Sequence, residues 1–399
     1  MSDILLTYSW VRSSYAALRN LSTHGVKVCV ADSHRVGMCQ LSRLKDGFER
    51  YTSHYEDENA FIEQVIEICR KRNVKIILPS HNETEILARH RDRLPGNLAA
   101  LLPDSSHCEL FNNKASAYEY AKSIGVPVPI RIKYNQPSQL AEAIHNSCFK
   151  KTVIKLLTGN SAKGVFYADD PISAQKIVEG LVIQYNLGYE RYPLVEERVE
   201  GEGWGNSVLY WHGQQIANFT HRRLREKIST GGTSTLRESA RHPELEAAAA
   251  KIFDTLGWHG LAMSEFKVCP KTGKFWFIEV NPRMWGSIPL AISAGVEFPY
   301  LAWLSATEGP VVAKAYHASC QAKHPWRGRW LLGDTMVVAQ QLLTGKIGAA
   351  SKTLFKSRAD SLDDFFWDDP FAFLGEVLYY GSNSLAKMSL NPSEKGMIG

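Results

Sequence analysis

Short strand-like segments alternate with amphipathic segments over the first hundred residues of the chain. Residues 4–8, 26–30 and 74–78 are rich in Ile, Leu and Val, and apolar residues recur at helical spacing between the last two. Strands that alternate with helices in this way predict a parallel sheet with helices on its faces. Ligands usually bind at the carboxyl ends of such strands, and here those ends carry the polar segments 8–10 and 80–83.

Longer elements follow from residue 113 onward. A helix is predicted over residues 115–124, because Gly125 and Pro127 form a stop signal just beyond it. The remaining predicted elements are strands over 152–157, 193–199, 262–268 and 274–280, two strands flanking a turn at 212–213, a helix over 244–256, and mostly helical chain past residue 300. Together these elements predict a mixed α/β (α+β) fold.

Composition and charge exclude several classes of protein. Of the 399 residues, 44% are hydrophobic and 22% are charged, so the chain is neither disordered nor collagen-like. The 46 basic and 41 acidic residues give a net charge of +5, which allows an anionic substrate but predicts no nucleic-acid partner. No apolar run approaches the roughly 18 residues of a membrane span, and the N-terminus lacks the pattern of a signal peptide. The seven scattered cysteines include no C-x-x-C pair, which favours free thiols and a cytoplasmic location.

Two acidic residues are brought together in a predicted hairpin over residues 263–283. Pro270 and Gly273 favour a chain reversal there, between two β-prone segments. Counting outward from the turn places Glu265 nearly opposite Glu279. Directly opposed like charges are destabilising, so this arrangement predicts a cation between the two carboxylates.

Asn281 and Arg283 share a face with Glu279 if the second strand stays regular. Carboxylate and amide oxygens suit Mg²⁺ rather than zinc, so Glu265, Glu279 and Asn281 are the predicted metal ligands. Two alternatives remain open from the residues alone. Either the strand edge is solvated, or Lys267 and Arg283 neutralise the two acids.

Two lysines occupy positions where their positive charge is unfavourable unless an anion lies nearby. Lys155 interrupts an apolar strand, and an unpaired buried charge is costly. The loop that follows, from Gly159 to Gly164, could place backbone N–H groups against a phosphate, although it is not a Walker A loop. Lys114 lies at a predicted helix start, where a cation opposes the helix dipole unless an anion offsets it. The alternative for either lysine is a surface side chain whose stem packs on the protein.

A basic segment with Arg222, Arg223 and Arg225 precedes a glycine-containing segment over residues 231–235. This order predicts a phosphate or carboxylate clamp with a mobile lid. The alternative is a solvated basic face.

The acidic and aromatic stretch over residues 363–370 has no basic counterpart at helical spacing. We therefore expect it to form a solvated cap anchored by its aromatic residues. No Gly-x-Ser-x-Gly motif and no Cys/His arrangement supports a nucleophilic hydrolase.

Taken in order, these motifs resemble the ATP-grasp superfamily of carboxylate–amine ligases, over roughly residues 1–300. The resemblance rests on Lys114 before a helix ending in Gly-Val-Pro-Val-Pro, on Lys155 with its glycine loop, on the Glu-Glu-Arg-Val segment 196–199 with Glu202, and on Glu265 with the segment 279–283, which matches the E-x-N-x-R pattern of the family. It implies an ATP-grasp architecture in four parts: a Rossmann-like domain over 1–112, a small subdomain over 113–193 and a large one over 194–310 that clasp ATP, and a helical extension over 311–399.

The resemblance also implies roles for single residues in binding ATP. Lys114 and Lys155 would hold the phosphates, and the loop from Gly159 to Gly164 would close over them. The remaining nucleotide contacts would come from Glu196, Glu197 and Val199 at the adenine edge, from Glu202 at the ribose, and from Val153 and Ile278 on the two faces of the adenine.

For the reacting end, the resemblance implies Mg²⁺ held by Glu265, Glu279 and Asn281, with Mn²⁺ as an alternative ion. Arg283, together with Arg222 or Arg225, would stabilise the transferred phosphoryl group.

The implied activity is ATP-dependent ligation. A carboxylate would be activated as an acyl phosphate and joined to an amine, with ADP and phosphate released. The expected partners are a small-molecule carboxylate and an amine, with an amino acid among them, and no membrane. A homodimer is also compatible, because residues 311–399 could shape either the acceptor site or a dimer contact. The alternatives are a small-molecule kinase or phosphotransferase, and a non-catalytic nucleotide-binding regulator.

Overall fold

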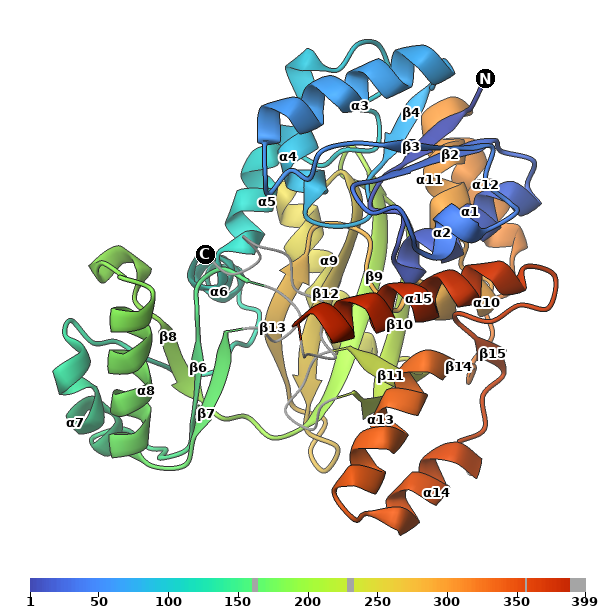
Figure 1. Cartoon of the computed structure of the whole chain (residues 1–399). Helices are drawn as coiled ribbons and strands as arrows, with labels where there is room; N and C mark the ends of the chain where they lie inside the picture. Colours follow the sequence, from blue (N-terminus) through green and yellow to red (C-terminus); the bar gives the residue numbers. More distant parts are fainter. Residues whose placement is uncertain (160–163, 228–232, 356, 388–399) are drawn as a thin grey trace. The chain divides into compact units, whose positions relative to one another are not determined.

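The computed structural model describes residues 1–159, 164–227, 233–355 and 357–387. The chain forms two compact units. Unit 1 comprises Met1–Cys108, Gly205–Met263 and the described residues from Asn281 onward, and unit 2 comprises Glu109–Trp204 and Ser264–Val280. The mixed α/β fold predicted from the sequence is confirmed (Figure 1). No described helix combines the length and the apolar composition needed to cross a bilayer.

The N-terminal part of unit 1 contains the predicted parallel sheet. Its strand order is β3-β2-β1-β4, with β1 at Ile4–Leu6, β2 at Val28–Asp32, β3 at Gly47–Arg50 and β4 at Ile76–Leu78. Strand β3 pairs in parallel with β2 and was not predicted. Its sequence, Gly-Phe-Glu-Arg, has no apolar run, and none of its residues is buried, as befits a strand at the sheet edge.

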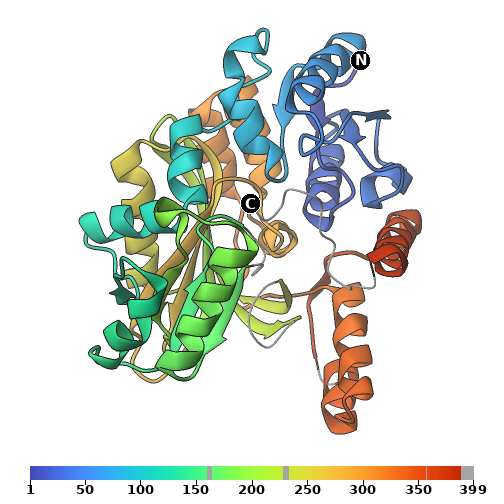
Figure 2. The ribbon, with the colours of Figure 1, turned by 60° about the vertical axis from the view of Figure 1, so that its left-hand side comes forward.

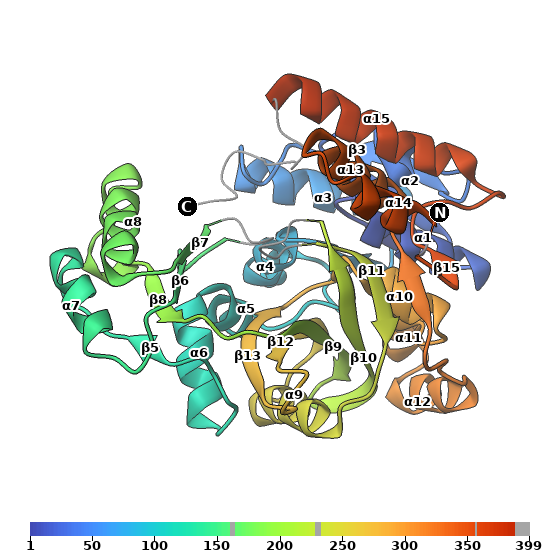
Figure 3. The same ribbon diagram turned by 90° about the horizontal axis from the view of Figure 1, so that it is seen from below.

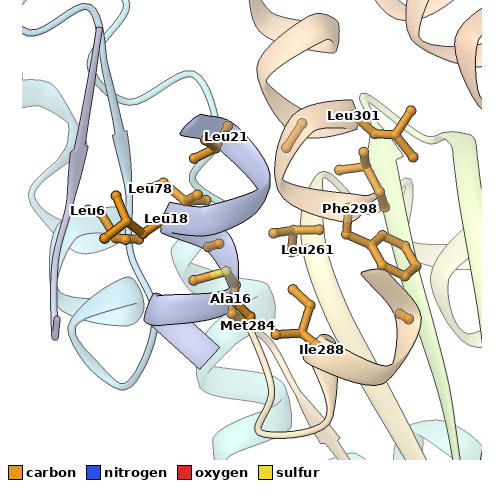
Figure 4. Close-up of a cluster of buried hydrophobic side chains, with 14 of the residues drawn as sticks. Leu6, Ala16, Leu18, Leu21, Leu78, Leu261, Met284, Ile288, Phe298 and Leu301 are labelled. Atoms are coloured by element: carbon orange, nitrogen blue, oxygen red, sulfur yellow. The ribbon is translucent and has the colours of Figure 1, made fainter. Parts of the chain in front are cut away.

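Helix α1 (Arg12–Thr23) joins this sheet to the rest of the core of unit 1. Figure 4 shows Leu18 and Leu21 of α1 beside Leu6 and Leu78 of the sheet, with Ile288 on the other side of the helix. Burying a side chain of this size contributes about 1.5–3 kcal/mol each. Flanking helices of unit 1 are α2 (Met38–Leu41), α3 (Glu58–Arg72), α4 (Glu83–Arg89), α9 (Pro243–Leu256), α10 (Ile288–Ser293), α11 (Phe298–Thr307) and α12 (Pro310–Ser319); α5 (Ser105–Asn112) contains residues of both units.

The largest sheet has seven strands in the order β13-β12-β9-β10-β11-β14-β15. Their bounds are β9 Glu202–Trp211, β10 Gln214–Glu226, β11 Ser234–Ser239, β12 Gly260–Val268, β13 Phe275–Asn281, β14 Arg327–Arg329 and β15 Ser361–Leu362. Figure 3 shows β9, β10 and β11 running side by side. Strands β9, β12 and β13 contain residues of both units.

The C-terminal region is mostly helical, as predicted, but it also adds two strands that the sequence did not predict. Strand β14 pairs with β11, and β15 pairs with β14. Both strands are too short for a recognisable alternation of apolar and polar residues. The helices are α13 (Leu331–Leu343), α14 (Ile347–Phe355) and α15 (Pro370–Lys387), and α13 lies alongside α14 in both Figure 1 and Figure 2.

The acidic stretch over residues 363–370 is not a solvated cap, so that prediction is wrong. Asp363, Asp364 and Asp369 are all buried. Asp363 forms an ion pair with Arg237 and lies 3.6 Å from Nε of Arg12. The basic partners come from β11 and α1, far away in sequence, which is why helical spacing could not reveal them.

Unit 2 is built on a four-stranded sheet with the order β5-β8-β6-β7. The strands are β5 Arg131–Ile132, β6 Thr152–Lys155, β7 Val165–Ala168 and β8 Leu194–Glu197, and the helices are α6 (Lys114–Ser123), α7 (Leu140–His145) and α8 (Pro171–Gln184). Ile154, Val178 and Val195 belong to the apolar cluster between this sheet and its helices. The predicted domain boundaries at residues 112, 193 and 310 remain predictions.

We expect Asp363→Ala to destabilise the protein by about 3–5 kcal/mol, because it leaves the fully buried Arg237 without its acidic partner. Asp368→Ala is the matched control. Asp368 is 49% exposed and pairs with Arg19, so its loss is expected to cost about 0–1 kcal/mol. Urea unfolding monitored by circular dichroism measures both, and equal costs would contradict the assignment of Asp363 as a structural counter-charge.

Candidate functional site

A buried ion pair lies at the centre of unit 2. Nζ of Lys155, at the end of β6, lies 2.6 Å from Oε1 of Glu196 on β8, and the two side chains are only 7% and 2% exposed. The antiparallel register of these strands pairs Val153 with Glu196 and Lys155 with Leu194, so the lysine and the glutamate are diagonal neighbours on one face. Strand pairing therefore provides the anion that a buried lysine needs.

Tyr118 completes this cluster. Nζ of Lys155 donates to the Tyr118 hydroxyl oxygen at 2.9 Å. Burial opposes the charge of Lys155, but Glu196 and Tyr118 outweigh it, so the pKa of Lys155 is raised above its ordinary value. Among the described residues, Oε2 of Glu196 is buried and has no hydrogen-bond partner. The lysine is thus held as a cation, and one carboxylate oxygen remains available as an acceptor.

Lys114 occupies the start of α6 in the same unit. The side chain of Asn113 caps this helix by accepting from the backbone N–H groups of Ala115 and Ser116. Lys114 Nζ donates to the backbone oxygen of Gly159 at 2.7 Å. Burial, aided by the charge of Lys155, lowers the pKa of Lys114, while Glu279 acts in the opposite direction.

Two lysines and two glutamates lie near one another in unit 2, because the charges of Lys155, Glu196 and Glu279 all affect the pKa of Lys114. Lys114 interacts with Lys155, Glu196 and Glu279. Two cations this close repel each other, and Lys114 also opposes the dipole of α6. An arrangement of this kind is suited to a ligand with several negative charges.

The glycine loop is described only at its two ends. Gly159 and Gly164 both have positive φ, +118° and +76°, which glycine adopts readily. A Cβ at Gly164 would also lie 2.9 Å from the side chain of Leu156. The predicted closure of this loop concerns residues 160–163, which lie outside the described residues.

The segment from β8 to β9 contains the residues predicted to read the adenine and the ribose. Glu196 is in the ion pair, and Oε1 of Glu197 accepts from the backbone N–H of Ile130 at 3.0 Å. Val199 follows in the connection, and Glu202 is the first residue of β9.

This connection lies tightly against β12. A Cβ at Gly201 would lie 2.5 Å from the backbone oxygen of Val268, so only glycine fits there. Lys267 Nζ donates to the backbone oxygen of Gly201 at 3.1 Å. The lysine that could have neutralised the acidic pair therefore has a backbone acceptor of its own.

The chain reversal between β12 and β13 is confirmed. The backbone N–H of Cys269 donates to Lys274 at 2.8 Å, and that of Gly273 donates to Cys269 at 2.9 Å. Gly273 has a φ of +71°, as this turn requires. The hairpin places Glu265 on β12 and Glu279 on β13, both half-buried.

The metal role of Glu265, Glu279 and Asn281 stays a prediction. No group of three or more His, Cys, Asp or Glu side chains in the described part of the chain could hold a metal ion. The predicted set differs from such a group, because it has two carboxylates and one amide. Asn281 is the last residue of β13 and lies two positions beyond Glu279. Ile278 comes directly before Glu279 on the same strand and is half-buried.

The predicted phosphoryl-binding arginines all have partners within unit 1. Arg222 Nη2 pairs with Glu238 at 2.7 Å, Arg225 Nη2 pairs with Asp334 at 2.5 Å, and Arg283 Nη1 donates to the backbone oxygen of Met284 at 3.0 Å. The mobile lid predicted over residues 231–235 is wrong in one part, because residues 234 and 235 belong to strand β11. Residues 231 and 232 lie outside the described chain.

Tyr118 was missed by the sequence analysis, although a signal was present. It lies four residues after Lys114 on a predicted helix, and residues at this spacing share a face. Its ring centroid also lies 6.0 Å from that of Phe277 on β13, in an edge-on arrangement. Glu238 and Asp334 were missed because their arginine partners are distant in sequence.

Comparison with known proteins identifies the fold. Residues 191–325 match a family described as "ATP-grasp in the biosynthetic pathway with Ter operon". Over 219 residues the chain is 26% identical to the N-terminal section of the carbamoyl phosphate synthase large chain from Methanopyrus kandleri, covering 55% of this chain and 35% of that protein. The chain spans between 12% and 35% of the length of the curated relatives that it matches.

Two solved structures share the fold. A biotin carboxylase from Campylobacter jejuni, described as a "beta-gamma-ATP" complex, superposes with a TM-score of 0.63 at 15% identity, covering 82% of this chain and 75% of that one. An L-amino acid ligase from Bacillus licheniformis superposes with a TM-score of 0.58 at 14% identity, covering 77% and 74%. The fold that the ATP-grasp resemblance implied is thereby confirmed.

The ion pair of unit 2 gives a stability prediction. Lys155→Met is expected to cost about 3–5 kcal/mol, because it leaves Glu196 buried and uncompensated. The double variant Lys155→Met/Glu196→Leu is expected to recover to within about 1 kcal/mol of the unsubstituted protein, since an apolar pair replaces the ionic one. Urea unfolding measures both.

The more exposed pair Arg131–Glu119 in the same unit is the control. Arg131→Met is expected to cost about 0–1 kcal/mol. A double variant no more stable than Lys155→Met alone would show that the pair does not act as a unit.

Proposed function

We propose that this chain, an ATP-grasp protein, is an ATP-dependent ligase that phosphorylates a carboxylate and joins the resulting acyl phosphate to an amine, with release of ADP and phosphate. The observation that carries the proposal is the buried Lys155–Glu196 pair with Lys114 beside it. Two lysines close together suit a ligand with several phosphates. The proteins similar to this chain include a carbamoyl phosphate synthase and an L-amino acid ligase, which supports the ligase activity in the proposal.

In this proposal the nucleotide lies on the face of unit 2 that carries the ion pair. Lys114 and Lys155 bind the phosphate oxygens, and the loop from Gly159 to Gly164 closes over them. Oε2 of Glu196, which has no hydrogen-bond partner among the described residues, accepts from the exocyclic amino group of adenine, beside Glu197 and Val199. Glu202 binds the ribose hydroxyls, and Val153 and Ile278 pack against the adenine ring.

Glu265, Glu279 and Asn281 fit Mg²⁺ by the chemistry of their oxygen donors. The closeness of Glu279 to Lys114 supports this assignment, because both then face the same phosphates. When bound, the ion neutralises charge on the β- and γ-phosphates. Mn²⁺ offers the same coordination preferences as an alternative.

The proposed chemistry requires positioning and charge neutralisation rather than a protein nucleophile. A carboxylate is a poor acyl donor because its leaving group would be an oxide, and phosphorylation converts that oxygen into a good leaving group. The carboxylate oxygen attacks the γ-phosphorus, and the bond to the ADP oxygen breaks. The amine nitrogen then bonds to the acyl carbon, the bond from that carbon to the phosphate oxygen breaks, and the proton lost by the nitrogen leaves with the phosphate. Arg283, with Arg222 or Arg225, stabilises the charge on the transferred group.

Measurement of ADP release tests the proposal. The full chain is incubated with Mg²⁺ and ATP and with the common amino acids singly and in pairs. We expect ADP release that requires both a carboxylate and an amine. A stable phosphorylated product formed without an amine would favour a kinase, and ATP binding without turnover would favour a regulator.

Glu279→Gln is expected to lower the rate of ADP release by about 100-fold or more, because it removes a charged donor from the proposed metal site. Its fold should be unchanged, since the amide has nearly the same shape. Glu190→Gln, on an exposed residue of unit 2, serves as the control and should leave the rate unaltered. A Glu279→Gln variant that releases ADP at the original rate would refute the metal assignment.

A further inference from the structure

The hairpin formed by α13 and α14 in unit 1 exposes large apolar side chains. Leu343 is 89% exposed, Ile347 is 70% exposed and Phe355 is 82% exposed. Leu342 and Leu354 beside them are exposed as well, and all but two of the residues of α14 lie outside the core. Single exposed apolar residues are normal on a protein surface, but five in one short hairpin form a patch that indicates an interaction. We call these five residues the hairpin patch.

The turn between the two helices has a defined geometry. The backbone N–H of Gly345 donates to the oxygen of Leu342 at 3.0 Å, and that of Lys346 donates to the oxygen of Gln341 at 2.8 Å. With a φ of +73° at Gly345, this is a Schellman motif. Such a motif commonly includes an apolar contact between its outer residues, which here are the polar Lys346 and Gln341. The turn therefore holds the chain in place without covering the apolar residues on either side of it.

All charged side chains of this hairpin are positive. Residues 335–359 include four basic residues and no acidic one. Lys346, Lys352 and Arg358 are exposed, and none of the three forms an ion pair with another described residue. Lys352 lies three positions before Phe355 on α14, so the two side chains share a face. The hairpin thus combines exposed apolar side chains with positive charge.

This combination favours the surface of an anionic bilayer over other partners. A second copy of the chain would bring the same basic residues together, and like charges across an interface are unfavourable. A nucleic acid would attract the lysines but would leave the apolar side chains in water. An anionic bilayer accepts both kinds of side chain, because basic residues bind its headgroups and apolar residues enter the boundary of its acyl chains.

We propose that the α13–α14 hairpin docks the protein on a bilayer that contains anionic phospholipids. Leu343, Ile347 and Phe355 enter the boundary between headgroups and acyl chains, at the two ends of α14. Lys346 and Lys352 bind lipid phosphates. This inference goes beyond the proposed function and does not depend on it.

The hairpin lies on the bilayer in this proposal and does not cross it. Helices α13 and α14 have 13 and 9 residues, whereas a helix that spans a bilayer needs about 20. A count of apolar runs long enough to span a bilayer therefore does not detect a surface of this kind. The signal is the exposure of the apolar residues beside basic ones, which only the structure reveals.

Co-sedimentation of the full chain with phospholipid vesicles tests the inference. The probes are vesicles of phosphatidylcholine alone, and vesicles in which one quarter of the lipid is phosphatidylglycerol. We expect about 100-fold tighter binding to the anionic vesicles, because each of three basic side chains near the surface contributes about fivefold in affinity. High salt should reduce this preference, since ions screen exposed charges. Equal binding to both kinds of vesicle, or no binding to either, would overturn the inference.

Two double variants separate the apolar and the electrostatic contributions. Leu343→Gln/Ile347→Gln is expected to weaken binding to anionic vesicles by about 100-fold or more, because two large apolar side chains are lost from the lipid. Lys346→Gln/Lys352→Gln is expected to weaken it by about 25-fold and to leave binding to neutral vesicles unchanged. All four side chains are exposed, so both variants should keep the circular dichroism spectrum of the unsubstituted protein.

Lys176→Gln/Ile183→Gln is the matched control, because it removes an exposed lysine and an exposed apolar side chain from α8 in unit 2. It should bind both kinds of vesicle as the unsubstituted protein does. Hairpin variants that bind like this control would refute the proposal. Sedimentation velocity without lipid examines the second copy as an alternative partner. We expect Leu343→Gln/Ile347→Gln to leave the oligomeric state unchanged, and a dimer that this variant dissociates would overturn the lipid assignment.

Discussion

A charge taken out of water needs an opposite charge beside it, and both units of this chain are organised around that constraint. In unit 2 the need arises at Lys155, which is buried on β6 and paired with Glu196 on the adjacent strand. In unit 1 it arises at Arg237, which is fully buried on β11 and paired with Asp363 from the C-terminal region. Unpaired, either cation would be costly enough to threaten the fold. Within the described residues, the pair in unit 2 leaves Oε2 of Glu196 without a hydrogen-bond partner, and the pair in unit 1 leaves Nε of Arg237 and Oδ1 of Asp363 without one.

The polar atoms that these pairs leave without a partner in the described structure connect stability to function. A buried pair that satisfied every polar atom would serve the fold alone. Glu196 instead keeps an acceptor and Lys114 lies near a second cation, so unit 2 suits a ligand that carries both phosphates and a hydrogen-bond donor. A nucleotide has both of these groups, and the proposed ligase needs one as its phosphoryl donor.

Local signals in the sequence were enough to predict much of the fold and some of the residues that the structure brings together in unit 2. Lys155 inside an apolar strand indicated a missing anion, and Pro270 with Gly273 indicated the reversal between β12 and β13. The identity of the anion could not be read, because Glu196 becomes a neighbour of Lys155 only through the pairing of β6 with β8. Strands β3, β14 and β15 were missed because each is short and lacks an apolar alternation, and depends on a neighbouring strand for its hydrogen bonds. Asp363 was taken for a solvated residue because its partner lies 126 positions away in the chain.

A crystal structure of the full chain with Mg²⁺ and a non-hydrolysable ATP analogue tests the central claim most directly. The account predicts phosphate oxygens within hydrogen-bonding distance of Nζ of Lys114 and Lys155, and the adenine amino group donating to Oε2 of Glu196. A nucleotide bound elsewhere, with the Lys155–Glu196 pair and its tyrosine partner untouched by the ligand, would contradict it.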